Sequence, residues 1–172
     1  LAWLERKGKI AVQDFPVSLL PLPPLPDEGA SAYCQRLCAW DLSIGYLWNA
    51  QAFHGFSLAE LREEIREMMA DGQPIPVEGP GNSKLIFKVP KPYPAQIQLI
   101  GELQRRGVDV WAVSASLEEL VRMVASDPLY GICIPPGRVI GVNLLLQRRD
   151  GSRFASAWDR TKGMEPADYR SE

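Results

Sequence analysis

Residues 108–127, with the sequence VDVWAVSASLEELVRMVASD, constrain the fold more than any other part of this chain. The run VDVWAVS is apolar without strict alternation, as strands are when both faces of a parallel sheet are covered. It stops at Ser114, and a helical pattern begins at Ser116. A buried strand that passes so directly into a helix is typical of α/β proteins, in which the two kinds of element alternate.

The sequence on both sides of this stretch continues the alternation. Residues 94–107 predict a helix that ends at Gly107, because glycine readily adopts the backbone conformation that terminates helices. Residues 138–158 predict a strand, an Asp-Gly turn and a returning strand. We expect three apolar side chains of the first helix to point inward: Leu99, Ile100 and Leu103.

The first half of the chain has a different sequence pattern, in which two proline-rich stretches flank a predicted helical region. Eleven of the 15 prolines fall within residues 16–26 and 74–94, and the pattern between these stretches is helical. Residues 57–72 form the clearest predicted helix. Ser57 and Glu60 make a capping box at its start, and Gly72 stands at its end. One apolar stripe with helical spacing follows the cap: Leu58, Leu61, Ile65 and Met68.

These patterns predict two regions: a mainly helical one over residues 1–87 and a partial α/β unit with a β-hairpin over residues 88–172. The segment KVPKPYP, residues 88–94, is the expected connection. The proline stretch at residues 16–26 allows two interpretations. It is either an extended segment packed between helices or a P-x-x-P ligand for an aromatic groove.

The two serines at the end of the predicted strand have different expected roles. Ser116 and Glu119 form a second capping box. Ser114 has no such role, and a hydroxyl at a strand end beside a helix N-terminus suits a phosphate oxygen. The alternative is that Ser114 only bonds a nearby backbone group. No G-x-S-x-G motif surrounds it and the single histidine, His54, is distant in sequence, so Ser114 is expected to orient a substrate and not to attack it.

The cysteines give little reason to expect a metal or a disulfide framework. There are three, Cys34, Cys38 and Cys133, and no C-x-x-C spacing occurs. Cys34 and Cys38 lie four residues apart on a predicted helix, where a metal site with His54 is one interpretation. Small core side chains are the other.

Composition narrows the classes of partner. The net charge is −2, which gives no reason to expect binding to nucleic acid or to anionic membranes. A hydrophobic share of 46% and a charged share of 23% are ordinary for a soluble domain, and no apolar run is long enough to cross a membrane. The sequence does not distinguish a bacterial periplasmic from a cytoplasmic location, and it does not give the oligomeric state.

The strand that ends at Ser114 resembles the second motif of the haloacid dehalogenase (HAD) superfamily. The longer run GVDVWAVSASLEELVRMVASDPLYGICIPPGRVIGVNLLL resembles the bacterial phosphorylcholine phosphatases and their phosphoserine-phosphatase-like neighbours. The upstream run YCQRLCAWDLSIGYLWNAQAFHGFSLAELREEIREMMADGQPIP is similar to the helical cap that these enzymes insert after their first motif. The resemblance implies a partial HAD-like, Rossmann-type core with an inserted, mainly helical cap domain.

The resemblance also implies a function, that of a magnesium-dependent phosphomonoester hydrolase acting on a small phosphate ester. Ser114 would hold a phosphoryl oxygen, with help from the amide of Ala115. Tyr33 would contribute to substrate binding, as the remaining aromatic residue of the tyrosine run that holds choline in those enzymes. Three further aromatic side chains either rebuild such a cage or belong to the core: Trp40, Tyr46 and Trp48.

The departures from the family pattern are equally informative. No two aspartates are spaced D-x-D, so the nucleophile and the Mg²⁺ ligands are expected outside this chain, and the chain assigns no metal ligand of its own. Lys162 comes too soon after the predicted hairpin to be the lysine of the third motif. The sequence therefore looks like an internal fragment, inactive alone. The alternative is a catalytically inactive or truncated HAD-like module for binding or interaction.

Overall fold

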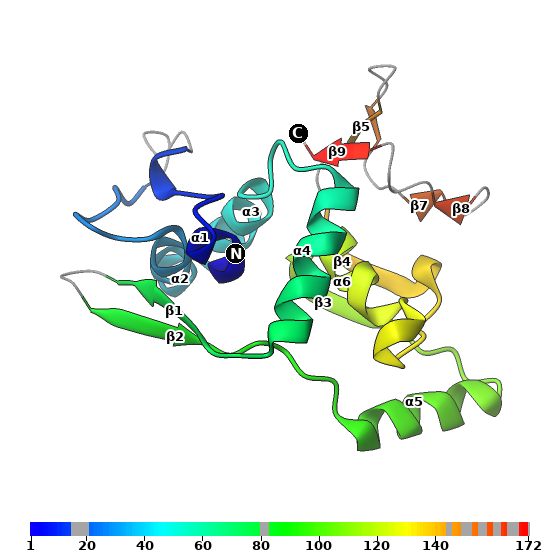
Figure 1. The fold of residues 1–172 in the computed structure, drawn as a ribbon. Coiled ribbons are helices and arrows are strands. Elements are labelled where there is room, and N and C mark those ends of the chain that lie inside the picture. The colour runs from blue at the N-terminus through cyan, green and yellow to red at the C-terminus, as the bar shows by residue number, and fades with distance from the viewer. Residues whose placement is uncertain are drawn as a thin grey trace. The chain divides into compact units, whose positions relative to one another are not determined.

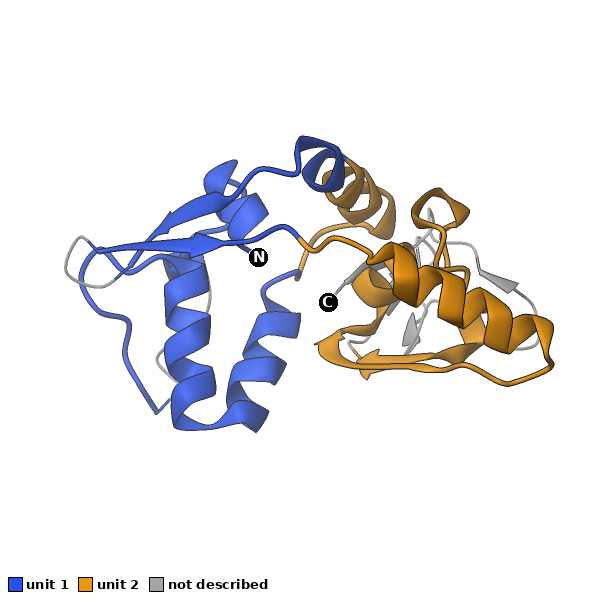
Figure 2. Ribbon diagram, turned by 90° about the horizontal axis from the view of Figure 1, so that it is seen from below, with its two compact units in different colours: residues 1–53, 67–89 blue, residues 54–66, 90–172 orange. Residues whose placement is uncertain are grey.

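The computed structural model describes residues 1–14, 21–79 and 83–143 in full. Beyond residue 143 it describes only the backbone of short strands. The chain divides into two compact units, one made of residues 1–53 and 67–89 and the other of residues 54–66 and 90–172 (Figure 2). One border falls between Val89 and Pro90, inside the proline-rich segment. The division into a cap over residues 1–87 and a core over residues 88–172 stays a prediction.

The first unit is mainly helical, with one hairpin of strands (Figure 1). Its elements are α1 (Ala2–Arg6), a short 3-10 helix η1 (Val12–Asp14), α2 (Ala30–Trp40), α3 (Leu42–Gln51), β1 (Ile75–Glu78) and β2 (Lys84–Phe87). Strands β1 and β2 are antiparallel. Helices α1, α2 and α3 contribute large buried side chains to this unit: Trp3, Leu4, Tyr33, Leu37 and Trp48.

Helices α2 and α3 form a close-packed pair joined at Asp41. The Asp41 carboxylate caps α3 by accepting the backbone N–H groups of Ser43 and Ile44, as capping residues do. Gly45 of α3 faces Cys38 of α2 so closely that a Cβ at residue 45 would lie 2.7 Å from the Cys38 backbone nitrogen. The absence of a side chain at residue 45 is therefore what allows the two helices to approach.

Helix α4 (Leu58–Asp71) confirms the clearest helix prediction. The Ser57 N–H donates to Glu60 Oε2 at 2.7 Å, and the Glu60 N–H donates to Ser57 Oγ at 3.2 Å. Gly72 follows the helix with φ +60°. Three stripe residues are buried and Met68 is half-buried: Leu58, Leu61 and Ile65. Glu64 is also buried, which the stripe does not predict. The helix contributes residues to both units.

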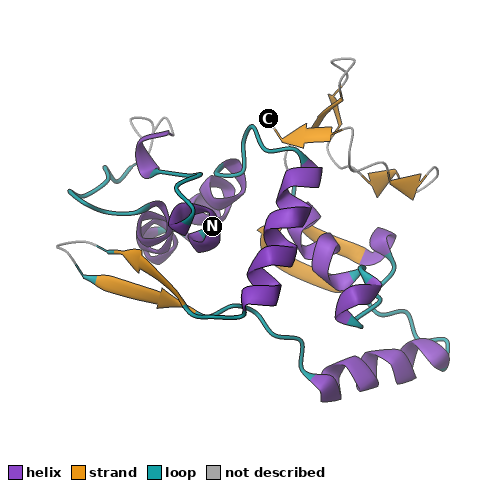
Figure 3. Ribbon diagram, viewed as in Figure 1, coloured by secondary structure: helices purple, strands orange, loops and turns teal. Residues whose placement is uncertain are grey.

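The second unit confirms the α/β class, because a parallel pair of strands is joined through a helix (Figure 3). Its main elements are α5 (Pro94–Arg105), β3 (Ala112–Leu117), α6 (Glu118–Ala125) and β4 (Val139–Val142). Two 3-10 helices connect α6 to β4: η4 (Pro128–Tyr130) and η5 (Pro136–Arg138). A parallel pair with a crossover helix is the unit from which Rossmann-type cores are built. The predicted end of α5 at Gly107, φ +78°, is also confirmed.

One face of the β3–β4 pair carries the core of this unit. Buried Ala125, Ile134 and Val139 form its centre. Half-buried apolar side chains of α5, β3, α6 and the segments before β3 and after η4 pack against it: Ile100, Val110, Ala112, Val121 and Ile132. Helix α6 contacts both strands.

The opposite face of the strand pair is open, and the prediction of a fully buried strand is wrong. Val113 is 77% exposed and Trp111 is 47% exposed, and Val113 pairs in register with exposed Ile140. The prediction that Leu99 points inward is also wrong, since it is 58% exposed. An apolar run shows that a strand has an apolar side, and it does not show how many of its faces are covered.

The described residues after β4 form five short strands: β5 (Leu146–Arg148), β6 (Arg153–Phe154), β7 (Trp158–Asp159), β8 (Gly163–Met164) and β9 (Tyr169–Ser171). Strand β5 pairs antiparallel with β6, in agreement with the predicted hairpin. β4 and β5 are separate strands, and not one as predicted. The Asp150–Gly151 turn and Lys162 lie outside the described residues. None of the described helices combines the length and the apolar character that crossing a membrane requires.

Candidate functional site

The end of β3 presents Ser114 and Ala115 in an irregular stretch of backbone. Val113 pairs with Ile140 and Leu117 pairs with Val142, and the register shifts between these two pairs. Residues 114–116 therefore lie outside the regular pairing with β4. Ser114 is half-buried, whereas Ala115 is exposed. The two residues assigned to the phosphoryl group thus lie in one accessible, irregular part of β3, residues 114–116, which we call the Ser114–Ser116 turn.

The Ser114 hydroxyl makes a local bond within this turn. Its Oγ accepts the backbone N–H of Ser116 at 3.1 Å, the kind of contact that serine commonly makes two residues along. A hydroxyl that accepts one hydrogen bond still carries its own proton. Ser114 can therefore shape the turn and donate to an incoming acceptor at the same time.

The predicted capping box of Ser116 and Glu119 is wrong. Strand β3 continues to Leu117, which is the N-cap of α6 and makes no side-chain capping bond. Ser116 belongs to the strand and is exposed, so its side chain lies one residue too early to cap the helix. Glu119 is 3% exposed and pairs with an arginine.

That arginine, Arg122, lies at the centre of a buried network that the sequence analysis missed. Its Nη2 donates to Glu118 Oε1 at 2.5 Å and its Nε donates to the carbonyl of Pro136 at 3.1 Å. Nη1 lies 2.6 Å from Glu119 Oε1, an ion pair without the alignment of a hydrogen bond. All three charged residues are buried, so the network ties α6 to the segment before β4 through the protein interior.

Glu118 also holds strand β4 directly. Its Oε2 accepts the backbone N–H of Gly141 at 3.1 Å. A Cβ at residue 141 would lie 2.7 Å from both the carbonyl oxygen of Ser116 and the Cα of Glu118. The turn after Ser114 is thus pressed against β4 at a position where only glycine fits without a shift.

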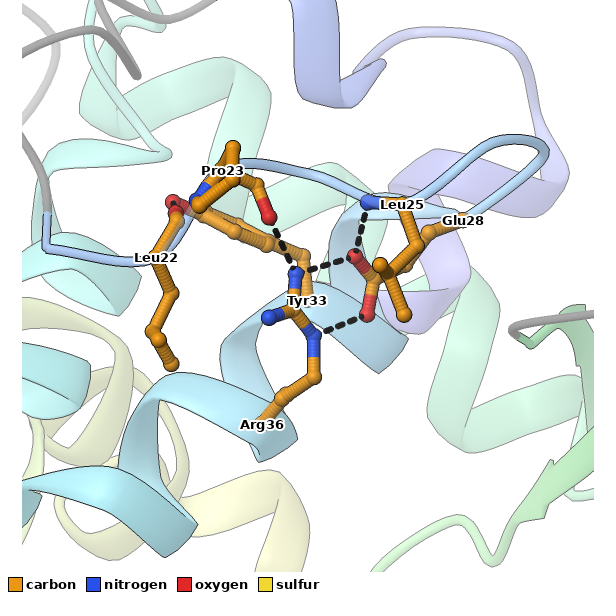
Figure 4. Close-up of polar contacts among 6 residues, drawn as sticks. All are labelled: Leu22, Pro23, Leu25, Glu28, Tyr33 and Arg36. Atoms are coloured by element: carbon orange, nitrogen blue, oxygen red, sulfur yellow. Dashed lines mark hydrogen bonds and ion pairs between the residues drawn. The ribbon is translucent and has the colours of Figure 1, made fainter.

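Tyr33, the third predicted site residue, lies in the core of the first unit. It has no exposed surface, and its hydroxyl donates to the carbonyl of Leu22 at 2.7 Å (Figure 4). Its ring meets Trp48 edge to face, with centroids 5.1 Å apart. These contacts are those of a packing residue, and the assignment of Tyr33 to substrate binding stays a prediction.

The contacts around Tyr33 also bear on the proline stretch. Arg36 binds the Glu28 carboxylate through two hydrogen bonds of 2.8 and 2.7 Å and donates to the carbonyl of Pro23 at 2.6 Å (Figure 4). The Leu25 N–H donates to the same carboxylate at 2.9 Å. The described part of the stretch, from residue 21, is therefore held to α2 by its own backbone, which favours the packed segment over a free polyproline ligand.

The Glu28 carboxylate is ionised despite its burial. Burial opposes the charge, but the hydrogen bonds from Arg36 and from the Leu25 amide, with the charge of Arg36, outweigh it and hold the pKa of Glu28 below its ordinary value. The Glu28 side chain is fully buried and that of Arg36 is 26% exposed. We call Glu28, Tyr33 and Arg36, with the backbone of residues 22–25, the proline clamp.

The remaining candidates divide between the core and the surface. Trp48 is buried, Tyr46 is half-buried, and Trp40 is 54% exposed, so the three do not share one environment. Burial, together with the neighbouring Cys38 thiol, raises the pKa of Cys34 to about 12, which disfavours the thiolate that a metal would need. Among the described residues, no three histidine, cysteine, aspartate or glutamate side chains are close enough to hold an ion.

The predicted site residues therefore belong to separate parts of the molecule. Ser114 and Ala115 lie in the second unit and Tyr33 in the first. The residues that the sequence analysis missed are Glu118 and Arg122. Their spacing of four residues is visible in the sequence, but such a pair is usually an exposed one on a helix surface, and nothing local reveals that this pair is buried.

Comparison with known proteins gives one close similarity. No protein-family model matches the chain. The chain is 39% identical over 165 residues to the phosphorylcholine phosphatase of Pseudomonas aeruginosa, and the match covers 91% of this chain and 47% of that protein. The chain thus spans about half the length of this relative.

A solved structure from Anaerococcus prevotii DSM 20548, of a conserved protein of unknown function, is also similar. Its TM-score is 0.49 at 18% sequence identity, and the match covers 68% of this chain and 33% of that one.

Proposed function

We propose that this chain is part of a phosphomonoester hydrolase of the HAD superfamily. The observation that carries the proposal is the 39% identity to a phosphorylcholine phosphatase over most of this chain. Since the chain spans only about half of that relative, the proposal concerns the full-length protein. The α/β architecture of the second unit is compatible with it.

In this proposal Ser114 binds the phosphoryl group. Its hydroxyl would donate to a phosphoryl oxygen while its Oγ keeps the Ser116 N–H, and the amide of Ala115 would add a second donor. Both residues are accessible at the turn before α6, and a helix N-terminus adds positive potential for an anion. The role is to orient the substrate and to stabilise charge, which is where most of the catalysis of phosphoryl transfer lies.

The attacking carboxylate and the metal are proposed to lie outside this chain. No D-x-D spacing occurs in the sequence, and the described residues offer no cluster that fits a metal ion. Magnesium dependence is therefore proposed for the full-length protein, with its ligands outside this chain.

The identity of the esterified alcohol is a separate proposal. Phosphorylcholine is the first candidate because of the relative's name. In this structure Tyr33 has no exposed face for a quaternary ammonium group. Contact between choline and Tyr33 would therefore require a rearrangement around this side chain, whereas Trp40, which is 54% exposed, offers an accessible aromatic face for a cation.

The test is hydrolysis of p-nitrophenyl phosphate and phosphorylcholine by the full-length protein, with Mg²⁺ and with EDTA. We expect Mg²⁺-dependent release of phosphate. The Ser114→Ala variant should have a lower kcat/KM. The expected loss of transition-state stabilisation is about 1–3 kcal/mol, the scale of one hydrogen bond to a charged group. If the full-length protein hydrolyses neither ester, the inactive interaction module is the better interpretation. An unchanged kcat/KM in Ser114→Ala would mean that the Ser114 hydroxyl has only its local structural role, the hydrogen bond from the Ser116 N–H.

A further inference from the structure

The buried network of Glu118, Glu119 and Arg122 begins two residues after the turn that carries Ser114 and Ala115. Burying charges in this way is costly unless each has a partner, and an apolar first turn would serve the helix equally well. The network therefore calls for an explanation beyond the stability of α6, and its contacts suggest one.

Glu118 connects the turn to β4 in two ways. Its carboxylate accepts the Gly141 N–H at 3.1 Å. Its backbone, together with the carbonyl of Ser116, lies against Gly141 so closely that a Cβ there would be 2.7 Å away. Since residues 114–116 have left the regular pairing with β4, this contact replaces the strand ladder as the restraint on the turn.

Arg122 fixes the direction of the Glu118 carboxylate. It binds Glu118 Oε1 while Gly141 binds Oε2, and its Nε is held in turn by the Pro136 carbonyl at 3.1 Å. Both side chains are almost without exposed surface, 3% for Arg122 and 8% for Glu118. A carboxylate held at both oxygens inside the protein cannot rotate freely, and the turn that depends on it is correspondingly fixed.

Arg122 also limits the charge beside the turn. Two carboxylates in the first turn of α6 would repel a phosphate bound at Ser114. One buried guanidinium between them offsets part of that repulsion, because charges interact more strongly where water is excluded.

We infer that Glu118 and Arg122 are positioning residues that hold the Ser114–Ser116 turn in a geometry able to bind a phosphoryl group. The inference rests on the proposed function, and it assigns to Glu118 and Arg122, but not to Glu119, a role that the comparison with the relative does not supply. A purely structural role would predict the same contacts. The experiment must therefore separate an effect transmitted through Ser114 from a general loss of stability.

The first arm is kinetic and uses the full-length protein with p-nitrophenyl phosphate and Mg²⁺. Glu118→Gln keeps the side-chain size but cannot satisfy Arg122 and Gly141 together. Glu119→Gln is the matched control, since it makes the same change of charge beside the same arginine. We expect Glu118→Gln to lower kcat roughly tenfold, the scale of a modest displacement of a catalytic group, and Glu119→Gln to change kcat less than about twofold.

A double-mutant cycle shows whether the effect passes through Ser114. In a Ser114→Ala background, Glu118→Gln should lower kcat less than about twofold, because the group that it positions is already absent. An equal loss in both backgrounds, or an equal loss for Glu119→Gln, would overturn the inference.

The second arm does not need phosphatase activity. Amide hydrogen exchange of Ser116 and Gly141, whose N–H groups donate to Ser114 Oγ and Glu118 Oε2, should be at least about tenfold faster in Glu118→Gln than in the unmodified protein, and unchanged in Glu119→Gln. Unchanged exchange in Glu118→Gln would overturn the inference. If the full-length protein hydrolyses no ester, the proposed function fails, and the exchange data still decide whether Glu118 holds the turn.

A second variant covers the case in which Glu118→Gln does not fold. Gly141→Ala disturbs the same turn from β4, since the added Cβ would lie 2.7 Å from the Ser116 carbonyl. It should lower kcat and accelerate exchange of the Ser116 amide, which donates to Ser114 Oγ. Normal kcat and normal exchange in Gly141→Ala would count against the inference.

Discussion

Two stretches of this chain carry the same helix-start motif, Ser-x-x-Glu, and only one of them forms a capping box. Ser57 and Glu60 exchange hydrogen bonds at the start of α4. Ser116 and Glu119 do not, because β3 continues to Leu117 and Glu119 pairs with Arg122. The same residues at the same spacing therefore give two structures.

The difference between the two motifs is burial. Glu60 is exposed, whereas Glu119 is buried beside a cation. A buried carboxylate costs several kcal/mol unless it is paired, while a helix cap contributes about 1 kcal/mol. Leu117 also pairs with Val142 of β4. This pairing keeps Ser116 in the strand, one residue before the N-cap of α6. A local motif thus decides the structure only where no stronger tertiary partner competes for its side chains.

The largest expected effect comes from removing the competing cation. Arg122→Met would leave Glu118 and Glu119 buried without their common partner, and should destabilise α6 and β4 by about 3–5 kcal/mol. Native-state hydrogen exchange of the α6 amides measures this loss. The control is Arg66→Met, since Arg66 is 44% exposed and lies 3.7 Å from Asp127; it should cost less than about 1 kcal/mol. Equal costs would show that burial is not what distinguishes the two motifs.

A second test extends the comparison to the proline clamp, where the Glu28 carboxylate is also buried and paired with an arginine. Glu28→Gln should cost about 1.5–3 kcal/mol at pH 7, because it replaces hydrogen bonds to a charged group. The folded-state pKa of Glu28 lies below its ordinary value of 4.5. Its contribution is therefore present above that value and is lost as the pH falls through the folded-state pKa.

The measurement for this variant is urea unfolding at pH 7 and at pH 3, followed by tryptophan fluorescence. The difference in stability between the original protein and Glu28→Gln should be larger at pH 7 than at pH 3. The same difference at both pH values would mean that Glu28 acts by packing and not by its charge.

A smaller effect is expected for the capping box that does form. Ser57→Ala removes the Oγ that accepts the Glu60 N–H and should destabilise the start of α4 by about 1 kcal/mol. Hydrogen exchange in the first turn of α4 is the measurement. Ser57→Thr keeps the hydroxyl and should restore most of the protection.

The smallest effect is expected for the motif that does not form. Ser116→Ala should change stability by no more than about 0.5 kcal/mol, because the Ser116 side chain is exposed and does not cap α6. The same exchange measurement on the α6 amides tests this. If Ser116→Ala destabilised the protein as much as Ser57→Ala, the result would indicate that Ser116 does cap α6 in solution.

The elements that local signals define were predicted well from the sequence. Helix α4 followed from its capping box and apolar stripe, α5 from its pattern of apolar residues and its end at Gly107, and the α/β class from the order of β3, α6 and β4. These signals are backbone preferences and periodicities within about one helix length, and they do not depend on the rest of the fold.

Burial was not predictable in the same way. The apolar run before Ser114 was expected to be covered on both faces, yet Val113 is 77% exposed. Conversely, Arg122 and Glu118 have the spacing of a surface ion pair and are buried. Sequence gives the polarity of a side chain, but which face is covered depends on the packing of distant elements.

The candidate site shows the same division. Ser114 and Ala115 became candidates because the apolar run of the predicted strand stops at Ser114, and their role in phosphoryl binding stays a prediction. The structure continues β3 through both residues to Leu117. Tyr33 could be assigned to substrate binding only by resemblance. Nothing in the neighbouring sequence reveals that its hydroxyl donates a hydrogen bond to the carbonyl of Leu22. Nothing in the sequence indicated that residue 141 must be glycine. A side chain is excluded there by the backbone of Ser116 and Glu118, which lies against residue 141 only in the folded structure.

The open face of the β3–β4 pair has a practical consequence for anyone who handles this chain. Trp111, Val113 and Ile140 present apolar side chains along two neighbouring strands, and such surfaces adhere to one another as concentration rises. Solubility during purification should therefore respond to a single lysine placed at residue 113, far more than to the same change on the polar side of α4.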